Sequence, residues 1–323
     1  MVFPELIDGG GEEMPYTQKE NTIVSKQTIV ALVPGRFKEN IRVALRSYDL
    51  EEIRFRVNRP PELVYRNDAY FMGAETLSTN DAEFIMNQLS QHSLYAFEEE
   101  LRNGFLTLAG GHRVGLGGET IVENGMVKTL KHVRSFNVRI TRQMNGVAGR
   151  YLTDLFHGQW RNTLIVGPPQ SGKTTLLRDI ARTASYGQQA KQMTPIPPRK
   201  VAIADERSEI AAAFEGVPQH DLGPRTDVLD RCPKAEGMMM LVRAMSPDLL
   251  IVDEIGSERD KSALREAMNA GVSVICSAHG RTVEDMEDRA LLRTSSGRPL
   301  FDRLLLLDGN KRGKLIIPKK VSV

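Results

Sequence analysis

The pattern of apolar and polar positions changes near residue 150. From Asn162 onward, short apolar runs alternate with stretches in which apolar residues recur at helical spacing. This alternation is typical of a parallel sheet covered by helices on both faces. It predicts strands at Thr163–Val166, Val201–Ala204, Leu249–Val252 and Val272–Cys276, an edge hairpin at Arg303–Leu307 and Lys314–Ile317, and helices at Lys173–Ser185, Glu206–Phe214, Lys234–Met245, Glu258–Ala270 and Val283–Leu292.

The earlier part of the chain mixes shorter patterns. Residues 53–57 alternate apolar and charged side chains, which predicts a half-buried strand, and residues 63–72 suggest a hairpin. Helical spacing runs from Asp81 to Leu101, and a glycine-rich segment at 104–118 predicts two short strands. We therefore expect a flexible tail at 1–25, a smaller α+β domain at 26–145 and an α/β domain at 146–323.

Composition excludes several classes of protein. The chain has 43 Lys and Arg against 41 Asp and Glu, so its formal net charge is only +2 and it does not coat polyanions. Its two cysteines, Cys232 and Cys276, rule out a disulfide scaffold and a four-cysteine zinc module and fit a reducing cytosol. No apolar run approaches the roughly 20 residues of a membrane span, and the acidic first residues do not resemble a signal peptide.

One segment of the chain contains basic residues but no acidic ones. Between Val127 and Tyr151 there are six basic residues and no acidic one. We interpret residues 128–150 as a basic linker between the domains, which could serve domain closure, contacts between subunits or lipid head groups.

A phosphate-binding loop is predicted between the first α/β strand and its helix. Its sequence is Gly167-Pro168-Pro169-Gln170-Ser171-Gly172-Lys173-Thr174, followed by Thr175. Glycines let backbone N–H groups surround phosphate oxygens, and the helix N-terminus adds partial positive charge. Lys173 is expected to reach the β- and γ-phosphates and Thr174 to bind Mg²⁺. The alternative is an ordinary Gly/Pro turn before a helix.

Two further strands end in pairs of acids. Asp253 and Glu254 follow the apolar run Leu249–Val252, as in a Walker B element. Asp253 is expected near Mg²⁺, and Glu254 is expected to orient or deprotonate the attacking water. Asp205 and Glu206 could support Mg²⁺ or that water, or could instead begin a helix, whose first turn favours acids.

His279 ends the fourth strand of the pattern. Ligands bind at the carboxyl ends of strands in sheets of this type, so Ser277 and His279 are expected to face the γ-phosphate region. A surface histidine is the alternative for His279. The charged segment 223–234 is expected to be a loop that contacts nucleotide, a neighbouring subunit or a partner, or is simply solvated.

The base is expected to be adenine. The chain has no Asn-Lys-x-Asp guanine-reading motif, because its only Asn-Lys pair, at 310–311, is followed by Arg-Gly. The expected ligands are therefore ATP and Mg²⁺.

With these motifs in place, the chain resembles the stage III sporulation protein AA family of endospore-forming bacteria. That family is similar to the ATPases of type II and type IV secretion and of pilus motors. The resemblance covers nearly the whole chain after the tail, and its most specific segments are 104–115, 205–210, 225–230, 232–237 and 253–256.

The resemblance implies a smaller N-terminal domain joined to a RecA-like ATPase domain, working as a homohexameric ring. It implies a cytoplasmic position in the mother cell, peripheral to the membrane that faces the forespore. There the ring would energise a secretion-like channel through membrane-bound sporulation proteins, with no stable nucleic-acid partner. Asp205 to Glu209 and His279 fall where secretion ATPases carry an acidic strand end and a histidine motif beside the nucleotide.

The chain also departs from the secretion ATPases. They often have Gly-Glu where this chain has Asp253-Glu254, and some have zinc modules that two cysteines cannot build. In those enzymes arginines of the smaller domain approach the phosphates. The candidates here are Arg113, Arg134, Arg139 and Arg142, and we assign Arg139 to the nucleotide site.

Two other functions stay open at this point. The basic run and the shared fold suggest a nucleic-acid-associated RecA-like ATPase, although the near-neutral net charge argues against it. A scaffold that binds nucleotide without turnover is the other alternative, and the combination of Lys173, Thr174, Asp253 and Glu254 argues against that.

Overall fold

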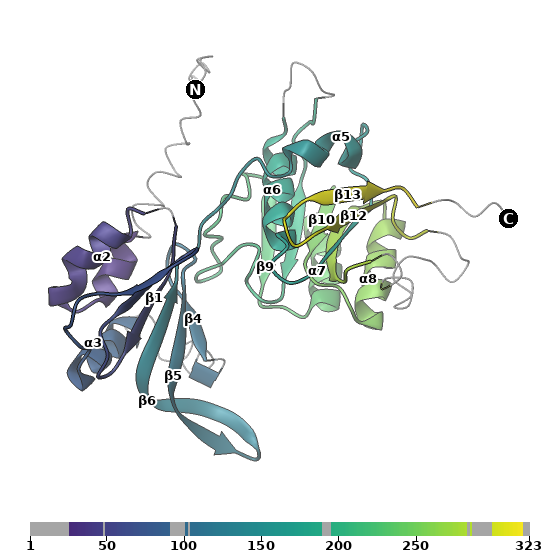
Figure 1. The fold of residues 1–323 in the computed structure, drawn as a ribbon. Helices are drawn as coiled ribbons and strands as arrows, with labels where there is room; N and C mark the ends of the chain where they lie inside the picture. The colour runs from purple at the N-terminus through teal and green to yellow at the C-terminus, as the bar shows by residue number, and fades with distance from the viewer. Residues whose placement is uncertain are drawn as a thin grey trace, which may run out of the picture. The chain divides into compact units, whose positions relative to one another are not determined.

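The computed structural model describes residues 26–47, 49–90, 101–102, 104–188, 195–282, 285 and 299–318. Its contacts divide the chain into two units, 1–141 and 142–323 (Figure 1). The expected tail lies outside the described residues, and so does the expected helix at Val283–Leu292 apart from Asp285. None of the helices in the described part of the chain is both long and apolar enough to cross a bilayer.

The first unit is built on a six-stranded antiparallel sheet in the order β3-β2-β1-β6-β5-β4. One cluster of buried side chains, which includes Ile29, Phe37, Ile41, Phe55 and Phe136, joins the sheet to its helices. The strands are β1 (Leu50–Arg56), β2 (Glu62–Tyr65), β3 (Ala69–Phe71), β4 (Phe105–Thr107), β5 (Arg113–Glu123) and β6 (Met126–Arg139). The helices are residues 26–32, η1 (Gly35–Phe37), α2 (Lys38–Ala44) and α3 (Thr79–Ser90).

The basic segment predicted as a linker is largely a strand. Residues 128–139 lie in β6, which pairs with β5 and, through its last five residues, with β1. Val133, Phe136 and Val138 of β6 are buried in the core of this unit, which explains why the segment is extended. Acids on the neighbouring strand pair with the exposed lysines, at 2.8 Å for Lys128–Glu123 and 2.9 Å for Lys131–Glu119.

The second unit contains a seven-stranded sheet in the order β13-β12-β7-β11-β10-β8-β9. Six strands run parallel, and only β13 is antiparallel to its neighbour. The strands are β7 (Thr163–Gly167), β8 (Val201–Asp205), β9 (Thr226–Asp230), β10 (Leu249–Val252), β11 (Ser273–His279), β12 (Arg303–Leu307) and β13 (Gly313–Ile316). The helices are η2 (Gly149–Tyr151), α5 (Leu152–Leu155), α6 (Lys173–Tyr186), α7 (Lys234–Met245) and α8 (Glu258–Asn269).

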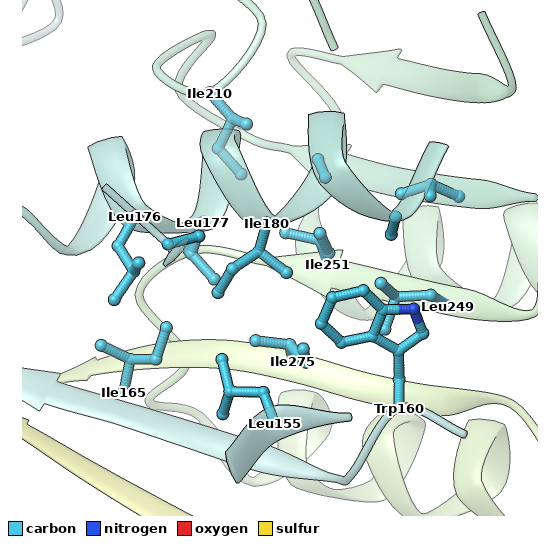
Figure 2. Close-up of a cluster of buried hydrophobic side chains, with 14 of the residues drawn as sticks. Leu155, Trp160, Ile165, Leu176, Leu177, Ile180, Ile210, Leu249, Ile251 and Ile275 are labelled. Carbon is cyan, nitrogen blue, oxygen red and sulfur yellow. The ribbon is translucent and has the colours of Figure 1, made fainter. Parts of the chain in front are cut away.

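Helices cover both faces of this sheet, as the sequence pattern predicts. Alternate residues of a strand point to opposite faces, so Leu249 and Ile251 of β10 pack toward α6, whereas Leu250 and Val252 pack toward α7 and α8. Figure 2 shows the first of these clusters, in which Leu177 and Ile180 of α6 lie over Ile251 and neighbouring strand residues. The predicted fold class, an α/β domain preceded by an α+β unit, is confirmed.

One strand was missed, because β9 lies within the segment predicted as a charged loop. It pairs in parallel with β8 at the edge of the sheet. Its residues Thr226–Asp230 are half-buried or exposed, and only Val228 and Leu229 among them are apolar, a pattern that a solvated loop can also show.

An ion pair between the exposed Arg36 and the buried Asp81 fastens the start of α3 to η1 in the first unit. The Arg36 guanidinium donates to Asp81 Oδ1 at 2.8 Å and also to Oδ2, and the Ser78 backbone and hydroxyl donate to the same carboxylate at 2.7 and 2.6 Å. Burial alone would raise the pKa of Asp81, but these hydrogen bonds outweigh it and lower the pKa from 3.8 to about 2. The ionised carboxylate therefore stabilises the folded unit.

We expect Asp81→Asn to lower the free energy of unfolding by about 2 kcal/mol at pH 7, since each pKa unit corresponds to 1.36 kcal/mol. A carboxylate whose pKa falls on folding contributes its full stability above the unfolded pKa and loses it as the pH falls through the folded pKa. The difference between wild type and variant should therefore shrink from pH 4 to pH 2. Urea titrations across this range measure it, and a difference independent of pH would contradict the assignment.

Candidate nucleotide site

The residues predicted to carry chemistry meet at one edge of the second sheet. Strands β7, β11, β10 and β8 are neighbours and run parallel. In their registers Gly167 lies opposite His279, and Val252 lies opposite both Cys276 and Ala204. The carboxyl ends of the four strands therefore open onto a common edge, where ligands bind in sheets of this type.

The loop between β7 and α6 needs glycine at two places. Gly172 has φ +91° and precedes the first residue of α6, a conformation that other residues rarely adopt. At Gly167 a β-carbon would collide with the Ser171 hydroxyl and lie 3.1 Å from the Leu307 carbonyl oxygen. The loop thus brings its backbone close to its own side chains and places the N-terminus of α6 beside the strand end, the arrangement that binds phosphate groups.

Lys173 is folded back onto this loop. Its ammonium donates to the carbonyl oxygens of Gly167 at 2.9 Å and Pro168 at 3.0 Å, and it lies 3.4 Å from His279 Nδ1. The side chain is 6% exposed, and burial lowers its pKa while the nearby Asp253 and Glu254 carboxylates oppose that shift. The lysine therefore occupies the centre of the loop and has His279 for a neighbour.

Asp253 connects the loop to the end of β10. Its Oδ2 accepts the Thr174 hydroxyl at 2.6 Å, although the two residues are 79 positions apart. Its Oδ1 accepts the Ser277 hydroxyl and, at 3.0 Å, the backbone N–H of Glu254. Ser277 is fully buried and holds Asp253, whereas we had expected it to face the γ-phosphate region.

Glu254 has an unusual backbone and a charged partner. Its φ is +51°, and its N–H also donates to Ser277 Oγ at 2.9 Å. Its side chain is only partly exposed, and Oε2 accepts a hydrogen bond from Arg207 Nη1 at 2.6 Å. No pattern in the sequence predicts this pair, because Arg207 lies 47 positions away in another loop.

Asp205 organises the segment after β8, which is not the helix predicted for Glu206–Phe214. Its carboxylate accepts the backbone N–H groups of Glu209, Ile210 and Ala211 at 2.8–3.0 Å. Ser208 and Ala212 adopt positive φ, which interrupts any helix. Burial raises the pKa of Asp205 to about 6, with the three N–H donors acting in the opposite direction. Such a desolvated carboxylate is typical of functional sites as well as of buried structural networks.

Arg178 of α6 holds the same segment from the other side. It donates from Nε to the Ile210 carbonyl at 2.8 Å and from Nη2 to the Glu209 carbonyl at 2.7 Å. Burial lowers the pKa of this guanidinium to about 10. The segment 205–212 is thus fixed both to the end of β8 and to the helix that begins at Lys173.

Of the remaining predicted residues, Glu206 lies beside Asp253 and Glu254, and Arg139 lies in the first unit. Glu206 pairs with Lys234, at the start of α7, at 2.7 Å. Asp205, Glu206 and Glu254 line a small pocket together with Arg207, Glu209, Lys234 and Asp253. Arg139 belongs to the first unit, where it lies 3.7 Å from Glu52 at the end of β6, so its approach to the nucleotide stays a prediction.

The donor set suits Mg²⁺ better than a metal held wholly by protein. No group of three or more His, Cys, Asp or Glu side chains in the described ranges could hold a metal ion. Mg²⁺ typically takes one or two protein oxygens and completes its shell with water and substrate phosphates. The adjoining oxygens of Thr174 and Asp253 fit that requirement.

Solved structures of a pilus motor and of an ATPase share the fold of the chain. The pilus retraction motor PilT with bound ADP aligns with a TM-score of 0.59 at 14% identity, over 88% of this chain and 83% of its own. The ATPase DotB of Legionella pneumophila aligns with a TM-score of 0.54 at 14% identity, over 91% and 79%.

Comparison of the sequence assigns the chain to a family. The family model described as sporulation stage III, protein AA matches residues 24–317, so the chain belongs to that family. Stage III sporulation protein AA of Bacillus subtilis (strain 168) is 51% identical over 263 residues, which cover 81% of this chain and 84% of the relative. The resemblance inferred from the motifs is confirmed.

We expect Asp205→Ala to release the backbone of the segment that follows β8. Without the carboxylate, three amide N–H groups lose their acceptor, and a buried unpaired donor is costly. Hydrogen exchange at Glu209, Ile210 and Ala211 should accelerate at least about tenfold, which corresponds to ~1.4 kcal/mol of lost local stability. Asp227→Ala, at an exposed position of β9, is the control. Unchanged exchange at the three amides would show that Asp205 does not hold the segment.

Proposed function

We propose that the chain binds and hydrolyses ATP with Mg²⁺. One observation carries the proposal: Thr174, at the end of the glycine loop, shares a 2.6 Å hydrogen bond with Asp253 at the end of β10. Two distant motifs of a phosphate-binding site are thereby assembled at the carboxyl edge of the sheet. The names of the structural neighbours, an ATPase and a motor with bound ADP, support the same activity.

Each residue of the edge has a role that its position supports. The backbone of Gly167 to Thr175 would surround the phosphates, and Lys173 would exchange its loop carbonyls for phosphate oxygens. Thr174 and Asp253 would hold Mg²⁺, which offsets the negative charge of the phosphates. Glu254 would accept a proton from the attacking water or orient it. Glu206 and His279 lie beside these groups, whereas Asp205 acts through the segment that it holds.

We further propose that the chain assembles into a homohexameric ring in the cytoplasm of the mother cell. The family assignment supports a place in sporulation, and likeness to a pilus motor supports mechanical work. The ring would sit at the membrane facing the forespore and energise a secretion-like channel through membrane-bound partners. An arginine of a neighbouring first unit, with Arg139 as our candidate, would complete the site.

A nucleic-acid motor has less support. Lys128 and Lys131 of the basic segment are paired with glutamates of β5, which reduces the charge that a phosphate backbone would meet.

We expect Glu254→Gln to lower the rate of ATP hydrolysis at least about 100-fold, the usual contribution of a positioned general base. The amide is nearly isosteric but cannot accept the proton, so ATP should bind with unchanged affinity. Lys173→Ala should instead weaken binding, because it removes the cation at the phosphates. Glu236→Gln, at an exposed position of α7, is the matched control. Hydrolysis at the wild-type rate by the Glu254 variant would reject its role.

Assembly into a ring predicts that hydrolysis per subunit rises steeply with protein concentration in the presence of Mg²⁺. The reason is that a site completed by a neighbouring subunit is inactive in the monomer. Sedimentation velocity on the same samples gives the state of assembly. A constant rate from a monomer would place the whole site within one chain and overturn the ring.

A further inference from the structure

We propose that Arg207 restrains Glu254, and that hydrolysis requires this ion pair to part. The inference rests on the proposed role of Glu254 and adds a positioning residue to it. Arg207 is outside the phosphate loop and the Walker B strand.

The contact itself is short and charged. Arg207 Nη1 donates to Glu254 Oε2 at 2.6 Å, and the pair lies at the rim of the pocket that Asp205, Glu206, Glu209 and Asp253 also line. A carboxylate oxygen engaged in a charge-assisted hydrogen bond is less available to accept a proton from water. In this conformation Arg207 therefore competes with the attacking water for one oxygen of Glu254.

Both backbones that carry the pair are held in place. Glu254 sits at φ +51° with its N–H bonded to Asp253 and Ser277, so its side chain leaves the strand in a fixed direction. On the opposite side, Arg207 begins the segment that Asp205 holds through three backbone N–H groups. The backbone on each side therefore holds the Arg207 guanidinium next to the Glu254 carboxylate.

The support of Arg207 is also tied to the phosphate loop. Arg178 of α6 bonds the carbonyl oxygens of Glu209 and Ile210, and α6 begins at Lys173. When Lys173 leaves its loop carbonyls for a phosphate, any resulting shift of α6 passes through Arg178 to the segment that carries Arg207. The ion pair is thus placed where occupancy of the loop can break it.

Three variants and one set of assays test the proposal in the full chain. Arg207→Gln removes the positive charge, and Arg207→Lys keeps the charge but replaces the planar guanidinium group with an ammonium group. Arg243→Gln is the control, because Arg243 lies on α7 near Glu266 and does not line the pocket. Hydrolysis is measured at saturating ATP, where kcat separates from KM, and ATP binding is measured with a fluorescent analogue. Thermal midpoints report on folding.

We expect Arg207→Gln to raise kcat about two- to fivefold, the change that corresponds to an exposed ion pair of ~0.5–1 kcal/mol. Nucleotide affinity should stay within about twofold and the thermal midpoint within about 2 °C, since an exposed pair contributes little to folding. Arg207→Lys should stay near the wild-type rate. Salt should raise kcat of the wild type by screening the pair, and should raise that of Arg207→Gln less.

Other outcomes overturn the proposal. An unchanged kcat in Arg207→Gln would mean that the pair does not limit hydrolysis, and a lower kcat would mean that Arg207 assists Glu254. If the wild type binds ATP without turnover, the proposed hydrolysis fails while nucleotide binding stands, and the inference, which rests on that hydrolysis, fails with it. If the wild type binds no ATP, the proposed function fails first, and the inference fails with it.

Discussion

The hydrogen bond between Thr174 and Asp253 is the contact on which the site depends. It joins the start of α6 to the end of β10, and Asp253 in turn fixes Ser277 of β11 and the backbone of Glu254. Three structural elements, α6, β10 and β11, are therefore joined through one carboxylate. Each of these hydrogen-bond partners is a hydroxyl or a backbone N–H.

A second buried carboxylate plays a corresponding role one strand further along. Asp205 satisfies three backbone donors that would otherwise be unpaired in an irregular segment, and Arg178 satisfies two of its acceptors. Backbone groups in the protein interior need such partners wherever regular secondary structure is absent. The loop that carries Arg207 and Glu206 is thus held by side-chain hydrogen bonds, although it is neither helix nor strand.

The sequence predicted the α/β unit well where burial dominates. The strands from Thr163, Val201, Leu249 and Arg303 begin at the predicted residues. The first three are fully buried, and such parallel strands are continuous apolar runs. It failed where a particular long-range contact decides the structure. Apolar spacing after Glu206 suggested a helix, but the Asp205 carboxylate captures the N–H groups that a helix would use. The charges of β6 concealed its buried residues Val133, Phe136 and Val138. The Arg207–Glu254 pair depends on two loops whose proximity only the sheet order reveals.

The order of strands also sets when the site can form during synthesis. Strand β11 lies between β7 and β10, yet it is made after both of them, since it begins at Ser273. Until β11 is inserted, no strand pairs with both β7 and β10, and Asp253 lacks Ser277. A nascent chain that ends before β11 therefore exposes the apolar edges of two parallel strands, and non-local pairing of this kind is slow and prone to aggregation. The chain must therefore be made through His279, at the end of β11, before this edge of the sheet is complete.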